Sequence, residues 1–287
     1  MSHHTLELDE VDLVYDVHGS IPAADGRPPL LMVGQPMDAS GFRAQVTRFD
    51  DRTVVTYDPR GLGRSTRKDG GVTNDPETQA RDLHALIEAL GVGPVDMLAS
   101  SGGAVSALAL VTAYPNDVRT LVAHEPPIDS VLPDADAVQR ARVAYTRAYQ
   151  EQGWGAGMAA FIAMTAWEGE ITDEFLSRSA PDPAAFGMPT EDDGARDDPL
   201  LSERSWAVAL YTPDLAALKA SPTRIVVAVG EESMKVYTGR TAIALAEQLG
   251  QQATVFPSHH GGFMDGEFGY AGQPDAFAAK LREVLEQ

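Results

Sequence analysis

The sequence predicts an α/β protein built on a doubly wound, mostly parallel sheet. The first observation is that residues 30–33 form a continuous apolar run, which is typical of a strand buried on both faces of a parallel sheet, and that residues 53–57 predict a second buried strand. The second is that residues 77–90, between two such runs, place apolar side chains at helical spacing. Buried strands that alternate with helices indicate a parallel sheet with helices on both faces.

The other elements follow in chain order from the same patterns. Alternating apolar and polar residues predict a half-exposed hairpin at 6–17. Further buried strands are expected at 95–98, 120–124, 224–229 and 253–256, and further helices at 104–114, 239–249 and 274–285.

The segment 126–212 has a different character. It carries amphipathic helical patterns at 138–149 and 157–167, a Pro/Asp/Gly-rich stretch at 177–199 and a further helical pattern at 201–210. Because strand alternation is absent from the pattern there, we expect a core formed by residues 1–125 and 213–287, interrupted by a helical insertion.

Composition limits the classes of function. The 287-residue chain has a formal net charge of −20, which argues against nucleic acid or an anionic membrane as a partner because both are polyanions. It has no cysteine and therefore no thiolate metal site. With neither a membrane-span pattern nor a secretory pattern, we expect a cytoplasmic protein acting on a small molecule. The oligomeric state stays open, a homodimer included.

A run of small residues separates the strand at 95–98 from the helix that follows it. Ser101 stands in this run, with Ala99 two residues before it and Gly103 two residues after it. This is the pattern of a nucleophile elbow, a turn so sharp that bulky residues do not fit at those two positions. The pattern favours Ser101 as a nucleophile.

The neighbouring Ser100 is the alternative centre of the same turn. That register would place Leu98 in a tight position, so it is disfavoured. In the favoured register, the Gly102 amide lies at the positive end of the next helix, where it can receive charge that develops on a carbonyl oxygen.

Several motifs in a fixed order resemble those of the α/β-hydrolase superfamily. They are Gly34-Gln35-Pro36, the loop from Asp58 to Ser65, the elbow, His124-Glu125-Pro126-Pro127 and His260-Gly261-Gly262-Phe263. The resemblance covers residues 5–125 and 213–287. It implies that the insertion at 126–212 is a lid over the active site, and that Arg60 and Ser65 brace their loop and take no part in the chemistry.

The resemblance also places a base and a second oxyanion donor. A serine hydroxyl needs a base, and the family keeps a histidine for this purpose after the last strand, where His260 fits better than His259. The family usually has His-Gly-x-Pro after the first central strand. This chain has Val33 in place of the histidine, and the Gln35 backbone amide occupies the donor position.

The acid that orients the base is less clearly marked. The commonest family position, three residues after the glycine that ends the penultimate strand, holds Ser233, which carries no charge. Some members carry the acid after the strand that follows the elbow helix, and Glu125 stands there. We therefore expect Glu125 to be the acid, with Glu232 as the alternative.

A serine nucleophile favours acyl transfer. We expect hydrolysis of a carboxylic ester or lactone of a small to medium, largely apolar substrate through an acyl-enzyme, without a metal or organic cofactor. The alternatives are cleavage of a C–C, amide or thioester bond by the same residues, a cofactor-free lyase or perhydrolase, and a non-catalytic ligand-binding member of the fold. The residues expected to line the substrate pocket are Gly34, Trp154, Phe161, Trp167, Trp206 and Phe263.

Overall fold

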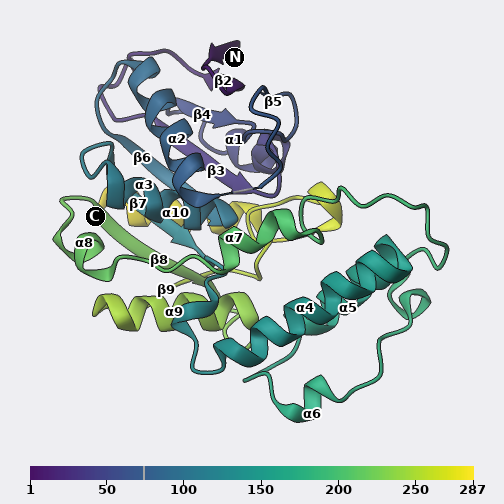
Figure 1. The fold of residues 1–287 in the computed structure, drawn as a ribbon. Helices are drawn as coiled ribbons and strands as arrows, with labels where there is room; N and C mark the ends of the chain where they lie inside the picture. Colours follow the sequence, from purple (N-terminus) through teal and green to yellow (C-terminus); the bar gives the residue numbers. More distant parts are fainter. Residues whose placement is uncertain (74) are drawn as a thin grey trace.

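A computed structural model of the protein describes residues 1–73 and 75–287. Its centre is a twisted sheet in the order β1-β2-β4-β3-β6-β7-β8-β9, with β5 paired to β2 (Figure 1). The strands are β1 (Ser2–Glu7), β2 (Val11–His18), β3 (Leu30–Gln35), β4 (Val54–Tyr57), β5 (Thr66–Arg67), β6 (Val95–Ser101), β7 (Val118–His124), β8 (Arg224–Gly230) and β9 (Thr254–Phe256). Along this order, the strands from β4 to β9 run parallel to one another, whereas the β1–β2 hairpin is antiparallel.

Helices cover both faces of the sheet, as the sequence predicts. Helices α2, α3 and α9 pack on one face and α1 and α10 on the other. The α-helices are α1 (Arg43–Val46), α2 (Pro76–Leu90), α3 (Gly102–Ala113), α4 (Ala135–Gln152), α5 (Trp154–Thr165), α6 (Asp173–Leu176), α7 (Trp206–Ala209), α8 (Leu215–Ala220), α9 (Tyr237–Leu249) and α10 (Pro274–Glu286). The 3-10 helices are η1 (Ala39–Phe42), η2 (Asp129–Val131), η3 (Pro183–Phe186), η4 (Glu203–Ser205) and η5 (Glu267–Gly269). No helix in the described part of the chain is both long and apolar enough to cross a membrane.

Helix α3 is the central helix and follows β6 without a loop. Its residues from Gly102 to Val111 are all buried, since the helix packs against β3, β6 and β7 and against helix α2. Small side chains permit this close approach. A β-carbon on Gly103 would lie 2.6 Å from the carbonyl oxygen of Val33 in β3, so only glycine fits there.

The loop after β4 is braced by Ser65, as expected from the sequence. The Ser65 hydroxyl donates to the carbonyl oxygen of Asp58 at 2.6 Å and accepts from the Val14 amide at 2.9 Å. The Asp58 carboxylate accepts from the backbone amides of Ala39 and Arg64. These bonds tie the loop to β2 and to the turn after β3, so the Ser65 hydroxyl has a structural role.

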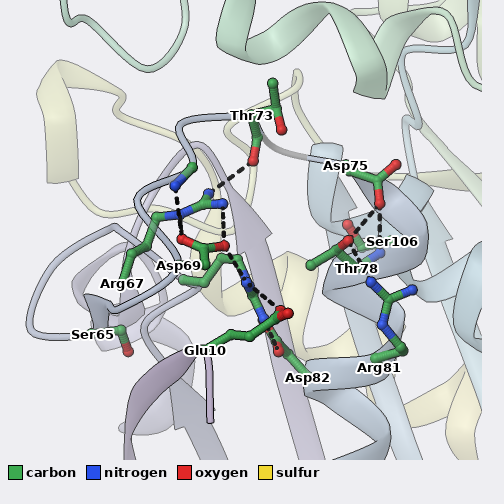
Figure 2. A network of polar contacts seen from close by, with 12 residues as sticks. Glu10, Ser65, Arg67, Asp69, Thr73, Asp75, Thr78, Arg81, Asp82 and Ser106 are labelled. Carbon is green, nitrogen blue, oxygen red and sulfur yellow. Dashed lines mark hydrogen bonds and ion pairs between the residues drawn. The ribbon is translucent and has the colours of Figure 1, made fainter. Parts of the chain in front are cut away.

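Arg60 braces the same loop from its other side. Its guanidinium donates two bonds of 2.7 Å to the Asp82 carboxylate on α2 and one of 2.9 Å to Asp69. Figure 2 shows Asp69 and Asp82 close to Glu10, whose carboxylate lies 3.5 Å from Nη1 of Arg60. Such a bidentate buried pair fixes geometry as well as charge, so the expected structural role of Arg60 is confirmed.

Residues 126–212 form only helices and loops in the structure. Helices α4 and α5 pack side by side and extend away from the sheet (Figure 1). The base of α4 is fixed to the core, because Arg142 pairs with Asp129 at 2.9 Å and the Tyr237 hydroxyl on α9 donates to the same carboxylate at 2.5 Å.

The helix expected at 201–210 is wrong in its extent. The segment divides into η4 and the single turn of α7. The Ser205 hydroxyl donates to the carbonyl oxygen of Leu200 at 2.8 Å, which shows a serine side chain competing with the helical pattern.

Candidate active site

Ser101 ends β6 and immediately precedes α3. Its backbone has φ 55° and ψ −131°, a conformation that costs about 1–3 kcal/mol for a residue with a side chain. Ser101 is half-buried, whereas Ser100 is 1 % exposed and faces the core. The strained turn therefore leaves Ser101 partly accessible to solvent and keeps Ser100 buried, which supports the register favoured by the sequence.

Backbone strain marks the same edge of the sheet in two more places. Four residues other than glycine have positive φ in the described part of the chain, and three of them are Ser101, Glu125 and Ser258. They lie at or just after the carboxyl ends of β6, β7 and β9. Strain of this kind is concentrated at functional sites, so it points to this edge.

Glu125 follows β7 and is completely buried. One carboxylate oxygen, Oε2, lies 2.6 Å from Nδ1 of His260 and accepts from the Thr238 hydroxyl at 2.5 Å. The other, Oε1, accepts from the Gly230 amide at 2.8 Å. Both oxygens of this buried carboxylate thus have hydrogen-bond donors.

These contacts decide the protonation of the carboxylate. Burial alone would raise the pKa of Glu125, but the hydrogen bond from His260, the charge of that ring and the Thr238 hydroxyl hold the pKa well below its usual range. Glu125 is therefore an anion that keeps the His260 proton on Nδ1. Nε2 of this ring is then the nitrogen available for proton transfer, and the His260 side chain is 34 % exposed.

The structure separates the two histidines of the last loop. Nδ1 of His259 accepts from the Gly261 amide at 3.0 Å, and its Nε2 lies 3.4 Å from the carbonyl oxygen of Ala271. His259 therefore braces the loop, whereas His260 faces a carboxylate.

Glu232 does not take the place of Glu125. Its side chain is exposed, and its backbone amide donates to the Ser258 carbonyl at 3.1 Å. Within the described residues, the only carboxylate hydrogen-bonded to His260 is that of Glu125.

The two expected oxyanion donors are neighbours. Gln35 in β3 pairs in register with Ser101 in β6. A β-carbon on Gly102 would lie 3.1 Å from the Gln35 carbonyl oxygen and 3.3 Å from a methyl group of Val208 in α7. The Gly102 amide lies in the first turn of α3, which favours negative charge. The contact with Val208 also places α7 of the insertion directly on the elbow.

Two of the expected pocket residues hold the insertion together. The Trp154 indole donates to Asp198 at 2.9 Å, and the Trp206 indole donates to Thr146 of α4 at 3.3 Å. Trp206 opens α7, the helix whose Val208 contacts the elbow, so it remains next to the candidate site.

Phe161 and Trp167 pack within the insertion. Phe161 lies edge-on to Tyr145, with ring centroids 5.5 Å apart. Trp167 packs against Phe175, and the guanidinium of Arg178 lies 4.4 Å from the centre of its ring. These contacts give Trp167 a structural role in the insertion.

Phe263 and Gly34 lie deeper than a pocket lining requires. Phe263 is 1 % exposed and stacks on Phe42 at 5.3 Å between centroids, so it belongs to the core beneath the His260 loop. At Gly34, a β-carbon would lie 2.2 Å from the end of the Met37 side chain. The expectation that Phe263 lines a pocket is therefore replaced by a core role.

Three residues contact the candidate site although the sequence did not assign them to it. Thr238 and Gly230 bond to Glu125 from 113 and 105 residues away in the chain, and Val208 reaches the elbow from the insertion. Gly230 could have been found as the glycine that ends β8. No local pattern marks Thr238 or Val208.

Comparison with known proteins agrees with this geometry. The profile described as the alpha/beta hydrolase family matches residues 17–280, and the chain belongs to this family. A curated relative is the uncharacterized hydrolase YraK of Bacillus subtilis, 27 % identical over 292 aligned residues that cover all of this chain and 97 % of that protein.

Solved structures show the same fold. An esterase from Thermogutta terrifontis superposes with a TM-score of 0.63 at 21 % identity, covering 100 % of this chain and 98 % of that one. An enol-lactonase from Burkholderia xenovorans LB400 superposes with a TM-score of 0.63 at 16 % identity, covering 99 % of this chain and 100 % of that one.

Proposed function

We propose that the protein is a serine hydrolase that cleaves a carboxylic ester or lactone of a small to medium, largely apolar substrate. The single observation that carries the proposal is the 2.6 Å contact between buried Glu125 and His260, at the sheet edge where Ser101 is strained. An acid that orients a histidine near a strained serine is the arrangement of a catalytic triad. The esterase and lactonase among the structural neighbours support this choice of substrate class.

The reaction follows from the roles of these groups. Ser101 Oγ attacks the carbonyl carbon while its proton moves to Nε2 of His260, and Glu125 stabilises the resulting imidazolium. The amides of Gln35 and Gly102 receive the charge on the carbonyl oxygen. The tetrahedral intermediate expels the alkoxide, which takes the proton from His260, and an acyl-enzyme remains. Water then attacks the acyl group while its proton passes to His260. The second tetrahedral intermediate breaks its bond to Ser101 Oγ, His260 returns the proton to that oxygen, and the carboxylic acid is released.

The insertion at 126–212 is the proposed lid. Support comes from α7, which lies against the elbow through Val208, and from Asp129, which pairs with Arg142 of α4 and accepts from the Tyr237 hydroxyl of the core. A lid with an apolar inner face would exclude water and favour an apolar acyl or alcohol group.

The proposal is tested by turnover of p-nitrophenyl esters and of lactones by the wild-type protein and by Ser101→Ala. If Ser101 is the nucleophile, the wild-type protein should hydrolyse esters or lactones, and Ser101→Ala should lower kcat by about 10⁴-fold or more. A fully active Ser101→Ala protein would contradict it. A wild-type protein that binds apolar esters without turnover would indicate a non-catalytic member of the family.

A further inference from the structure

A histidine that the proposed chemistry does not use lies directly beneath the site. His124 is the last residue of β7 and is completely buried. Aromatic rings surround it, with centroid distances of 6.2 Å to Phe256, 6.1 Å to Phe263 and 5.3 Å to Phe277. An imidazole in such a setting costs free energy unless its nitrogens interact with polar groups.

The two ring nitrogens of His124 face two parts of the site. Nδ1 lies 3.1 Å from the hydroxyl of Ser100, which is the residue before Ser101 and pairs in register with His124. Nε2 lies 4.0 Å from Oε1 of Glu125 and has no hydrogen-bond partner within the described residues. His124 thus stands between the elbow and the acid.

Electrostatics selects the tautomer of this ring. Burial lowers the pKa of His124 to about 4, against the raising effect of the Glu125 charge, so the ring is neutral at pH 7. A proton on Nδ1 would turn the Nε2 lone pair toward a carboxylate, whereas a proton on Nε2 turns an N–H dipole toward it. The second arrangement is favoured, and the Ser100 hydroxyl then donates to Nδ1.

We propose that His124 is a positioning residue for Glu125. Its Nε2–H faces Oε1 and adds to the Gly230 amide there, and the other oxygen, Oε2, bonds to His260. The inference rests on the proposed function, because it assigns His124 a part in setting how strongly the acid holds the base. The titratable groups that act on His124 are Glu125, His260 and His259.

Loss of the Nε2–H dipole would remove a favourable interaction with the negative charge of the Glu125 carboxylate. The carboxylate would then hold the Nδ1 proton of His260 more strongly, and the base would stay protonated to a higher pH. The acid limb of the kcat/KM profile would move to higher pH as a result.

Three variants separate the two nitrogens. His124→Gln keeps a donor near the Nε2 position, His124→Asn keeps an acceptor near the Nδ1 position, and His124→Phe keeps neither. We expect the midpoint of the acid limb to rise by about 0.5 pH unit in the Phe and Asn variants, a roughly threefold loss of kcat/KM below the midpoint. The Gln variant should retain the wild-type midpoint.

A second measurement needs no substrate. The low-field proton resonance of the His260 Nδ1–H should move further downfield in the Phe and Asn variants and stay in place in the Gln variant. An unchanged resonance and an unchanged profile in the Asn variant would overturn the inference. Rescue by Asn but not by Gln would also overturn it, in favour of a structural contact to Ser100. If the Phe variant fails to fold, the Asn and Gln pair still decides.

The proposed function and the role of His124 are tested by different measurements. A wild-type protein without hydrolytic activity, or a fully active Ser101→Ala variant, would contradict the proposed function. The resonance of His260 would still report whether His124 acts on Glu125.

Discussion

A β-carbon on Gly103 would lie 2.6 Å from the carbonyl oxygen of Val33, so helix α3 can approach strand β3 only with glycine at this position. The obstacle is backbone in the centre of the sheet and cannot rotate away. Gly103→Ala should therefore lower the free energy of unfolding by about 1–3 kcal/mol, the usual cost of overpacking.

Urea unfolding measures this prediction, and Gly71→Ala is the matched control. A β-carbon on Gly71 would meet the ends of the Arg67 and Asp69 side chains and no backbone atom among its nearest neighbours, so we expect little change. Equal stability of the two variants would show that the close approach of α3 is not tight.

The identity of the acid is tested by Glu125→Gln and Glu232→Gln. An amide at position 125 no longer stabilises the imidazolium and favours the wrong tautomer of His260, so kcat should fall by about 10³–10⁴-fold. Glu232→Gln changes an exposed side chain and should leave kcat nearly unchanged. The reverse ranking would move the acid to Glu232. A large drop in Tm of Glu125→Gln, with kcat per folded molecule retained, would make Glu125 a structural carboxylate.

Stability should depend on pH through His124. The folded protein keeps this ring neutral down to about pH 4, since its pKa is lowered to about 4 from the ordinary value of 6.5. Between these values the unfolded chain binds more protons, so stability falls as pH falls from 6.5 to 4. The loss attributable to His124 is about 3 kcal/mol.

Urea unfolding at several pH values tests this contribution. The difference in stability between the wild-type protein and His124→Phe should be constant above pH 7 and should change in favour of the variant as the pH falls toward 4. A difference that is independent of pH would mean that burial does not lower the pKa of His124.

The two tryptophans at 167 and 206 should differ in their effect on specificity. Trp206 belongs to α7, which contacts the elbow at Gly102 through Val208, whereas Trp167 packs elsewhere within the insertion. Trp206→Ala should change the ratio of kcat/KM for hexanoate and acetate esters by about tenfold. Trp167→Ala is the control and should leave the ratio unchanged. Equal effects would contradict a substrate contact of Trp206.

Sequence reasoning could predict the features that depend on neighbouring residues. The elbow is recognisable because a strand, a sharp turn and a helix occupy consecutive residues around Ser101. The sheet is recognisable because buried strands such as β3 and β8 contain continuous apolar runs. Glu125 could be proposed because it follows the strand after the elbow helix, where the resemblance places the acid of some family members.

The remaining features depend on contacts across the fold. Thr238 reaches Glu125 from the first turn of α9, and no local pattern indicates which hydroxyl faces a buried carboxylate. The family resemblance favours His260 over His259, but the contact with Glu125 that supports this choice joins residues 135 positions apart. The extent of the helix at 201–210 depends on the hydroxyl of Ser205, whose competing bond to Leu200 is not visible in an apolar pattern.

Covalent labelling will show whether Ser101 is the nucleophile. A fluorophosphonate should form one adduct, which peptide mass spectrometry should place on Ser101, with loss of esterase activity in proportion to labelling. The Ser101→Ala protein should stay unlabelled. An adduct on Ser100, or full ester hydrolysis by a protein labelled at Ser101, would contradict the account.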